Sequence, residues 1–205
     1  CPNQLCGQWK RELEDKIKSD YNISIISVLT KVHFDKYTYQ DLLDADFVIL
    51  SYSFLDNKSF LDPWMNKISK NKSYHKSPSS VFDRQNVQNI LNTMKNDIIK
   101  DPSLLCKTGA LLQLIHWHRI IVDEFHEVHT VGKYSHIINL LPLFDATYKW
   151  CVSGTPFDKN INYLYNMIDF TTGYTNLYGN KIILNQNIKN HVLTHFFRRN
   201  TKKSV

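Results

Sequence analysis

The feature that most constrains this chain is the stretch WHRIIVDEFHEV, which occupies residues 117–128. Within it, the apolar β-formers Ile-Ile-Val at positions 120–122 lead directly into two adjacent carboxylates, Asp123 and Glu124. Such an apolar run is typical of a strand buried on both faces, as in a parallel sheet. Ligands of open α/β sheets lie beyond the carboxyl ends of the strands, so both acids would reach the binding edge. Paired carboxylates there suit a magnesium nucleotide; the alternative is a buried strand that ends in a solvated acidic turn.

Short apolar runs alternate with helical spacing along the chain, and this pattern predicts an α/β fold with a mainly parallel sheet. Further strands are expected at Ile23–Val28, Ala45–Leu50 and Tyr148–Val152. Helices are expected over residues 81–100, 104–115, 135–141, 161–168 and 181–195. Another helix is expected to start at the cap Asn3, with Leu5, Trp9, Leu13 and Ile17 near one face. On that spacing, Trp9 is expected in the core.

Composition favours one intracellular domain with an insertion. The chain has 205 residues, no apolar run long enough to span a bilayer, and an amino end (CPNQLCGQWK) without a signal-peptide pattern. No membrane partner is therefore expected. Four cysteines form no CxxC pair, so reduced structural thiols are expected. The net charge is +6, with basic clusters in the polar stretch 58–76 and at Arg198, Arg199, Lys202 and Lys203. These clusters suit a polyanion partner, or else form a solvated loop and tail.

Five short motifs occur in a specific order: CPNQLCGQWK, DADFVILSYSF, WHRIIVDEFHEV, WCVSGTPFDKN and FFRRNTKK. This order resembles the first motor lobe of the Swi/Snf-type DNA-dependent ATPases of helicase superfamily two. In that family, Pro2, Gln8 and Trp9 match motif Ia and Ser51-Tyr52 matches motif Ib. The acidic box is motif II, the turn at residues 153–156 is motif III, and the Arg-Arg-x-x-Lys stretch closes the lobe. The resemblance implies a three-layer RecA-like α/β lobe, with an insertion at residues 57–110 between motifs Ib and II.

The family's roles pass to the matching positions only. By resemblance, Asp123 holds Mg²⁺ through water and Glu124 orients or deprotonates the hydrolytic water. His126 would couple the nucleotide state to motif III, at Ser153, Gly154 and Thr155. The residues expected to face DNA phosphates are Pro2, Asn3, Ser51, Tyr52, Arg198, Arg199 and Lys202. The implied cofactors are ATP and Mg²⁺, and the implied partners are duplex DNA and a second RecA-like lobe.

The chain departs from the family pattern at several positions. Phe125 stands where the family has a small residue, and Asp158 and Lys159 replace a Gln-Asn pair. None of the six glycines opens a GxxxxGK[ST] phosphate-binding loop. The family's loop precedes motif Ia, so we expect the lobe to be incomplete at its amino edge. We also expect the 205 residues alone not to turn over ATP.

Two other interpretations stay open. The first is a zinc hydrolase that uses Asp123 or Glu124 together with histidines from His116, His118, His126 and His129, although HEVH is one residue short of HExxH. The second is a non-catalytic nucleic-acid-binding or scaffold module derived from the same fold. The expected location is the nucleus in a cellular eukaryote, and otherwise the cytoplasm or a viral replication compartment.

Overall fold

The computed structural model describes residues 1–17, 20–57, 59–60, 81–109, 111–129, 137–155, 162–172 and 194. The expected helix at 181–195, apart from residue 194, and the basic residues 198–203 lie outside this part of the chain. The helices are α1 (Asn3–Lys16), α2 (Lys31–Phe34), α3 (Tyr39–Asp44), α4 (Tyr52–Leu55), α6 (Val81–Lys100), α7 (Ile137–Leu140) and α8 (Asn162–Thr172). The strands are β1 (Ile25–Val28), β2 (Phe47–Leu50), β3 (His116–Val122) and β4 (Asp145–Cys151).

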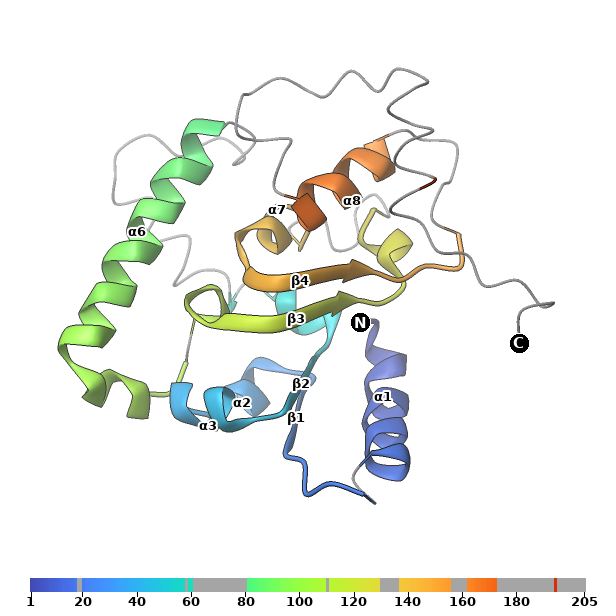
Figure 1. The fold of residues 1–205 in the computed structure, drawn as a ribbon, viewed down its shortest axis with the longest axis horizontal. Coiled ribbons are helices and arrows are strands. Elements are labelled where there is room, and N and C mark those ends of the chain that lie inside the picture. Colours follow the sequence, from blue (N-terminus) through green and yellow to red (C-terminus); the bar gives the residue numbers. More distant parts are fainter. Residues whose placement is uncertain are drawn as a thin grey trace.

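The strands form two parallel pairs, β1 with β2 and β3 with β4. Helices cover the pairs: α1 lies beside β1 and β2, while α7 and α8 lie over β3 and β4 (Figure 1). Crossovers between parallel strands put helices on sheet faces, and each strand pair here is joined by such a crossover. The α/β prediction is confirmed.

A single large core joins the two strand pairs. It contains Val28 from β1, Val122 from β3 and Phe170 from α8, each at most 3% exposed. A smaller cluster holds α1 against β2 through Cys6, Leu13 and Ile49. These contacts place the start of α1 close to the carboxyl ends of the strands.

Backbone bonds at residue 1 extend the ladder of β2. The Cys1 nitrogen donates to the Leu50 carbonyl at 3.0 Å, and the Tyr52 amide donates to the Cys1 carbonyl at 2.9 Å. This is the bonding pattern of a parallel bridge between Cys1 and Ser51. It fixes the first turn of α1 beside the Ser51–Tyr52 turn.

Several local predictions were wrong. Ile121, expected in a strand buried on both faces, is 44% exposed. Helix α1 begins at Asn3 itself, with Pro2 as the cap residue and no side-chain cap bond. Trp9 is 36% exposed rather than buried in the core. The helix expected over 104–115 is replaced by two short 3₁₀ turns, Pro102–Cys106 and Leu112–Leu114. Proline at the first helical position and glycine at 109, with φ +74°, favour short turns over a continuous helix.

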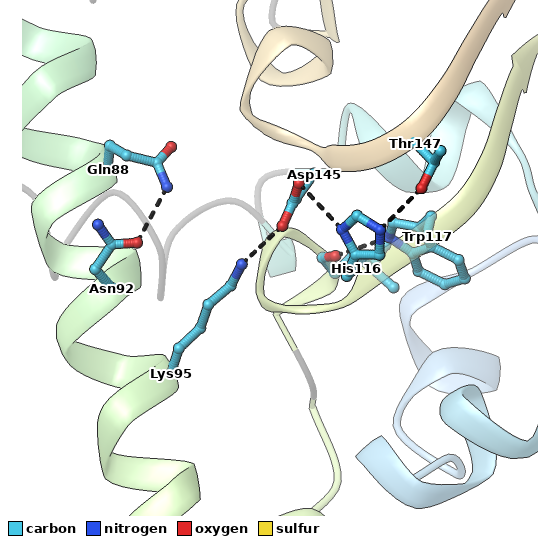
Figure 2. A network of polar contacts seen from close by, with 8 residues as sticks. Gln88, Asn92, Lys95, His116, Trp117, Asp145 and Thr147 are labelled. Atoms are coloured by element: carbon cyan, nitrogen blue, oxygen red, sulfur yellow. Dashed lines mark hydrogen bonds and ion pairs between the residues drawn. The ribbon is translucent and has the colours of Figure 1, made fainter.

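The long helix α6 is tied to the amino edge of β3 and β4 by a charged network (Figure 2). Lys95 Nζ lies 2.9 Å from one Asp145 carboxylate oxygen, and His116 Nδ1 lies 3.3 Å from the other. Thr147 Oγ1 lies 3.0 Å from the second ring nitrogen of His116. Burial alone would raise the pKa of Asp145, but the hydrogen bonds from Lys95 and His116 outweigh it, and the pKa lies below its usual value of 3.8.

This network predicts a pH-dependent contribution to stability. A carboxyl group whose pKa is lowered on folding stabilises the fold above its unfolded pKa, and the contribution disappears as the pH falls through the folded pKa. We therefore expect Lys95→Met to lower the urea midpoint slightly at neutral pH, and the difference from wild type to disappear as the pH falls through the lowered pKa of Asp145. Lys100→Met removes a charge from the same helix without touching Asp145 and serves as control. A Lys95→Met effect that persists unchanged in acid would contradict the prediction.

Candidate nucleotide-binding site

The acidic box lies at the carboxyl end of β3, and the strand ladder continues beyond it. The Val152 amide donates to the Val122 carbonyl, and the Phe125 amide donates to the Val152 carbonyl, both at 2.9 Å. These two bonds hold the turn after β3 against the segment after β4. As a result, residues 123–126 and 153–155 occupy the same edge of the strands.

Asp123 is held from three directions. One carboxylate oxygen accepts from the Glu124 amide at 2.9 Å, and the other accepts from the Trp9 indole N–H at 2.8 Å. Its backbone carbonyl accepts a hydrogen bond from the Tyr52 hydroxyl. A carboxylate offers about four acceptor sites, so each oxygen keeps capacity for a further contact. That capacity fits a Mg²⁺ ion held through water, the mode in which Mg²⁺ is commonly bound by a single carboxylate.

Glu124 and His126 face the motif III segment instead. Glu124 Oε2 lies 3.1 Å from His126 Nδ1, and the same ring nitrogen lies 3.0 Å from Ser153 Oγ. The Thr155 amide donates to Ser153 Oγ at 3.2 Å, around the exposed Gly154. The histidine therefore touches the acidic box and the motif III hydroxyl at one nitrogen. A change in the hydrogen-bond partner of His126 would therefore alter contacts of both the acidic box and the motif III segment.

The side chain of Phe125 packs in the main hydrophobic core. Its side chain is 0% exposed, and its ring centroid lies 6.2 Å from that of Phe170 on α8. Because the ring points into the core, its bulk does not displace the backbone bond between Phe125 and Val152. The core therefore accommodates a bulky residue at this position of the acidic box.

The residues expected to face DNA divide into buried and exposed groups. Pro2, Ser51 and Tyr52 are buried, whereas Asn3 is exposed. The Ser51 hydroxyl donates to the Leu29 carbonyl and accepts from the Phe54 amide, both at 3.1 Å. The hydroxyl groups of Ser51 and Tyr52 are therefore engaged inside the protein. At the surface of this edge lie Asn3 and Ser53, joined by a 3.3 Å bond from the Ser53 amide to Asn3 Oδ1.

Two contacts were not anticipated from the sequence, those of Trp9 and Tyr52 with Asp123. Burial, reinforced by the nearby charge of Asp123, raises the pKa of the Tyr52 hydroxyl, so it remains a hydrogen-bond donor. The motif order could have suggested proximity of the three segments. Helical spacing alone assigned Trp9 to the apolar face, and it could not reveal the indole N–H bond.

A groove of about 660 Å³ separates β2 from β3. Trp9, Tyr52 and Asp123 contribute to its lining, together with apolar side chains of both strands. Within the described ranges, no strand bridges β2 and β3. The groove therefore extends along both strands to Asp123 of the acidic box.

Among the histidines of the zinc interpretation, His116 and His118 lie far from His126. His116 and His118 lie on β3, which begins at His116, whereas His126 and His129 follow its carboxyl end. Seven strand residues span about 20 Å, too far for shared ligation. In the part of the chain that the structure covers, no group of three or more His, Cys, Asp or Glu side chains is placed to hold a metal ion.

Parallel strands that deliver an acidic pair to their carboxyl edge, next to a Ser-Gly-Thr turn, define a RecA-like lobe of the helicase type. The chain belongs to the SNF2-related domain family, whose family model matches residues 1–189. The chain is 23% identical over 185 residues to the helicase-like transcription factor CHR28 of Arabidopsis thaliana. It is 24% identical over 173 residues to the DNA repair protein RAD5A of the same plant. Each match covers 83% of this chain but only 18% and 12% of the respective relatives.

Proposed function

We propose that this chain is part of an ATP-driven DNA motor of the Swi/Snf type, which couples Mg-ATP hydrolysis to movement on duplex DNA. The observation that supports this most is the contact of His126 with both Glu124 and Ser153. An acidic turn without nucleotide chemistry has no need of such a link to the next strand. Family membership supports the same function, and the names of the relatives, which include helicase-like and DNA repair proteins, agree with it.

The chain's own residues have distinct parts in this proposal. Asp123 would hold the metal ion through water, with its carboxylate oriented by Trp9 and the Glu124 amide. Glu124 would orient the attacking water, and His126 would relay the state of Glu124 to Ser153 and Thr155. Bound Mg-ATP would supply the phosphoryl group and the neutralisation of its developing charge. The phosphate loop that hydrolysis requires must come from outside these 205 residues, so phosphate release by the isolated chain is not expected.

A non-catalytic DNA-binding or scaffold module is the second candidate. Such a module needs no phosphate-binding loop, and the 205 residues contain no GxxxxGK[ST] motif. The intact contacts among Glu124, His126 and Ser153 favour the motor instead. A GK[ST] motif in the coding sequence upstream of Cys1 would decide for the motor. From family membership and the names of the relatives we propose a nuclear setting.

None of the helices among the described residues combines the length and the apolar character needed to cross a bilayer. From family membership, the proposed partners are duplex DNA and a second RecA-like lobe.

The DNA-binding part of the proposal is tested by salt dependence. The purified chain is expected to bind a short duplex, with affinity that falls steeply as salt rises. Each phosphate contact contributes about 0.9 to the slope of log K against log salt, so Arg198→Ala, Arg199→Ala and Lys202→Ala together should flatten it by about 2–3. Fluorescence anisotropy with labelled duplex measures this slope.

The matched control removes the same charge elsewhere. Lys36, Lys100 and Lys107 are exposed and lie outside the five motifs, after α2, at the end of α6 and after the first 3₁₀ turn. Their combined replacement by alanine is expected to leave the slope within about 1 of wild type. An equal flattening by both triple variants would show non-specific attraction by net charge and contradict the proposed DNA-facing role of the carboxyl end.

A further inference from the structure

The Asp123 carboxylate is bonded directly to the helix whose first turn is proposed to face DNA. The Trp9 indole N–H donates to its Oδ2 atom at 2.8 Å, over 114 positions of sequence. On the backbone side of the same residue, the Tyr52 hydroxyl donates to the carbonyl. Trp9 and Tyr52 come from different segments, α1 and α4, so Asp123 is their common contact.

The two donors belong to one hydrogen-bonded unit. The Tyr52 amide donates to the Cys1 carbonyl at 2.9 Å, and the Ser53 amide donates to Asn3 Oδ1 at 3.3 Å. The start of α1 and the start of α4 are thereby locked together. Displacement of either one is expected to move the other and, through Trp9 and Tyr52, the residue that both contact.

Trp9 is well placed to transmit such a displacement. It follows Asn3 by six positions on the same helix, about 9 Å along the axis. Its ring is 36% exposed, whereas the face of α1 that packs on the strands is formed by the buried Cys6 and Leu13. The indole is thus turned toward the acidic box rather than into the core, and its N–H group is used there.

We propose that Trp9 is a positioning residue that couples duplex DNA at the start of α1 to the metal affinity of Asp123. The inference rests on the proposed function and adds a specific route within it. The indole N–H fixes one carboxylate oxygen, and the other oxygen is fixed by the Glu124 amide. A phosphate bound at Asn3 and Ser53 would shift α1, and hence the carboxylate that faces the metal.

The first test observes the indole directly. The chain contains four tryptophans, and Trp→Phe variants would assign their indole N–H signals in a nitrogen-15 correlation spectrum. The Trp9 signal is expected to shift on addition of Mg²⁺ alone and on addition of duplex alone. It is also expected to shift in Asp123→Asn, because the acceptor loses its charge. A Trp9 signal that ignores both ligands, while others report duplex binding, would overturn the inference.

The second test measures the coupling by binding. Duplex affinity is determined with and without Mg²⁺ at constant ionic strength in wild type, Trp9→Phe and Trp117→Phe. Trp117 is a matched control, since its indole N–H also makes one hydrogen bond, to the Leu112 carbonyl at 3.1 Å. The action of Mg²⁺ on the duplex itself is common to all three proteins. On addition of Mg²⁺, the duplex affinities of wild type and Trp117→Phe are expected to change about fivefold more than the affinity of Trp9→Phe.

The outcomes separate the two proposals. Duplex binding with the same Mg²⁺ effect in wild type and Trp9→Phe would overturn the role of Trp9 and leave the proposed DNA motor intact. Loss of the Mg²⁺ effect in Trp117→Phe as well would also overturn the role of Trp9, because loss of either indole hydrogen bond would then abolish the effect. No duplex binding by any of the three proteins would overturn the proposed function and, with it, the coupling.

Discussion

Replacing Phe125 with alanine is expected to lower the free energy of unfolding by about 3–5 kcal/mol, the largest loss we predict for a single substitution. The side chain is 0% exposed and belongs to the main core, where it packs near Phe170. Truncation removes the buried ring and leaves a cavity that the strands around it can fill only in part. Urea denaturation, followed by circular dichroism, would measure the loss.

The control for Phe125 is Ile121→Ala. Ile121 precedes the same acidic box, but its side chain is 44% exposed, so its truncation should cost no more than about 1 kcal/mol. Phe125→Leu should fall between the two, because it keeps part of the buried volume. A decrease in the free energy of unfolding below about 1 kcal/mol for Phe125→Ala would contradict the packing of the ring in the core.

The order of strands and acids was predictable because it depends on local pattern. The length and β-branching of the apolar run at residues 120–122 favour a strand, although Ile121 within it is 44% exposed. Parallel strands then bring their carboxyl ends to one edge, which places Asp123 near the turn at Ser153. Sequence pattern therefore predicted which segments meet at the candidate site.

The direction of individual side chains was not predictable. Trp9 matches the apolar spacing of α1, yet the interface that α1 buries is narrow and leaves the ring beside Asp123. Tyr52 was expected to face DNA, and its hydroxyl instead points inward to the Asp123 carbonyl. Both outcomes depend on where a distant segment lies, and helical or strand periodicity contains no such information.

Local signals also competed at the ends of elements. Asn3 is a favourable cap residue, but its side-chain oxygen accepts from the Ser53 amide, 50 positions away in sequence, and the helix starts one residue earlier than a cap at Asn3 would allow. A tertiary hydrogen bond replaced the local one there. The remaining site assignments, including Arg198, Arg199 and Lys202, stay predictions that the proposed binding experiments address.

Replacing Glu124 with glycine is expected to raise the free energy of unfolding by about 1 kcal/mol, whereas replacing Phe125 with alanine lowers it. Glu124 has φ +51°, in the left-handed region, which costs a residue with a Cβ atom about 1–2 kcal/mol. Glycine adopts this conformation without that cost, although its more flexible unfolded state offsets part of the gain. The backbone bonds of residue 124 to Asp123 Oδ1 and from the Glu127 amide remain possible in the variant.

Glu124→Ala is the matched control for this substitution, because it removes the carboxylate as glycine does but keeps the Cβ atom and the backbone cost. Both variants lack the contact with His126, so the difference in their urea-unfolding free energies isolates the conformational term. Equal stability of the two variants would contradict the strain. A stabilised glycine variant would mean that the fold tolerates an unfavourable backbone at the residue proposed to orient water. Such a cost is expected where the position of a carboxylate matters more than the stability of its turn.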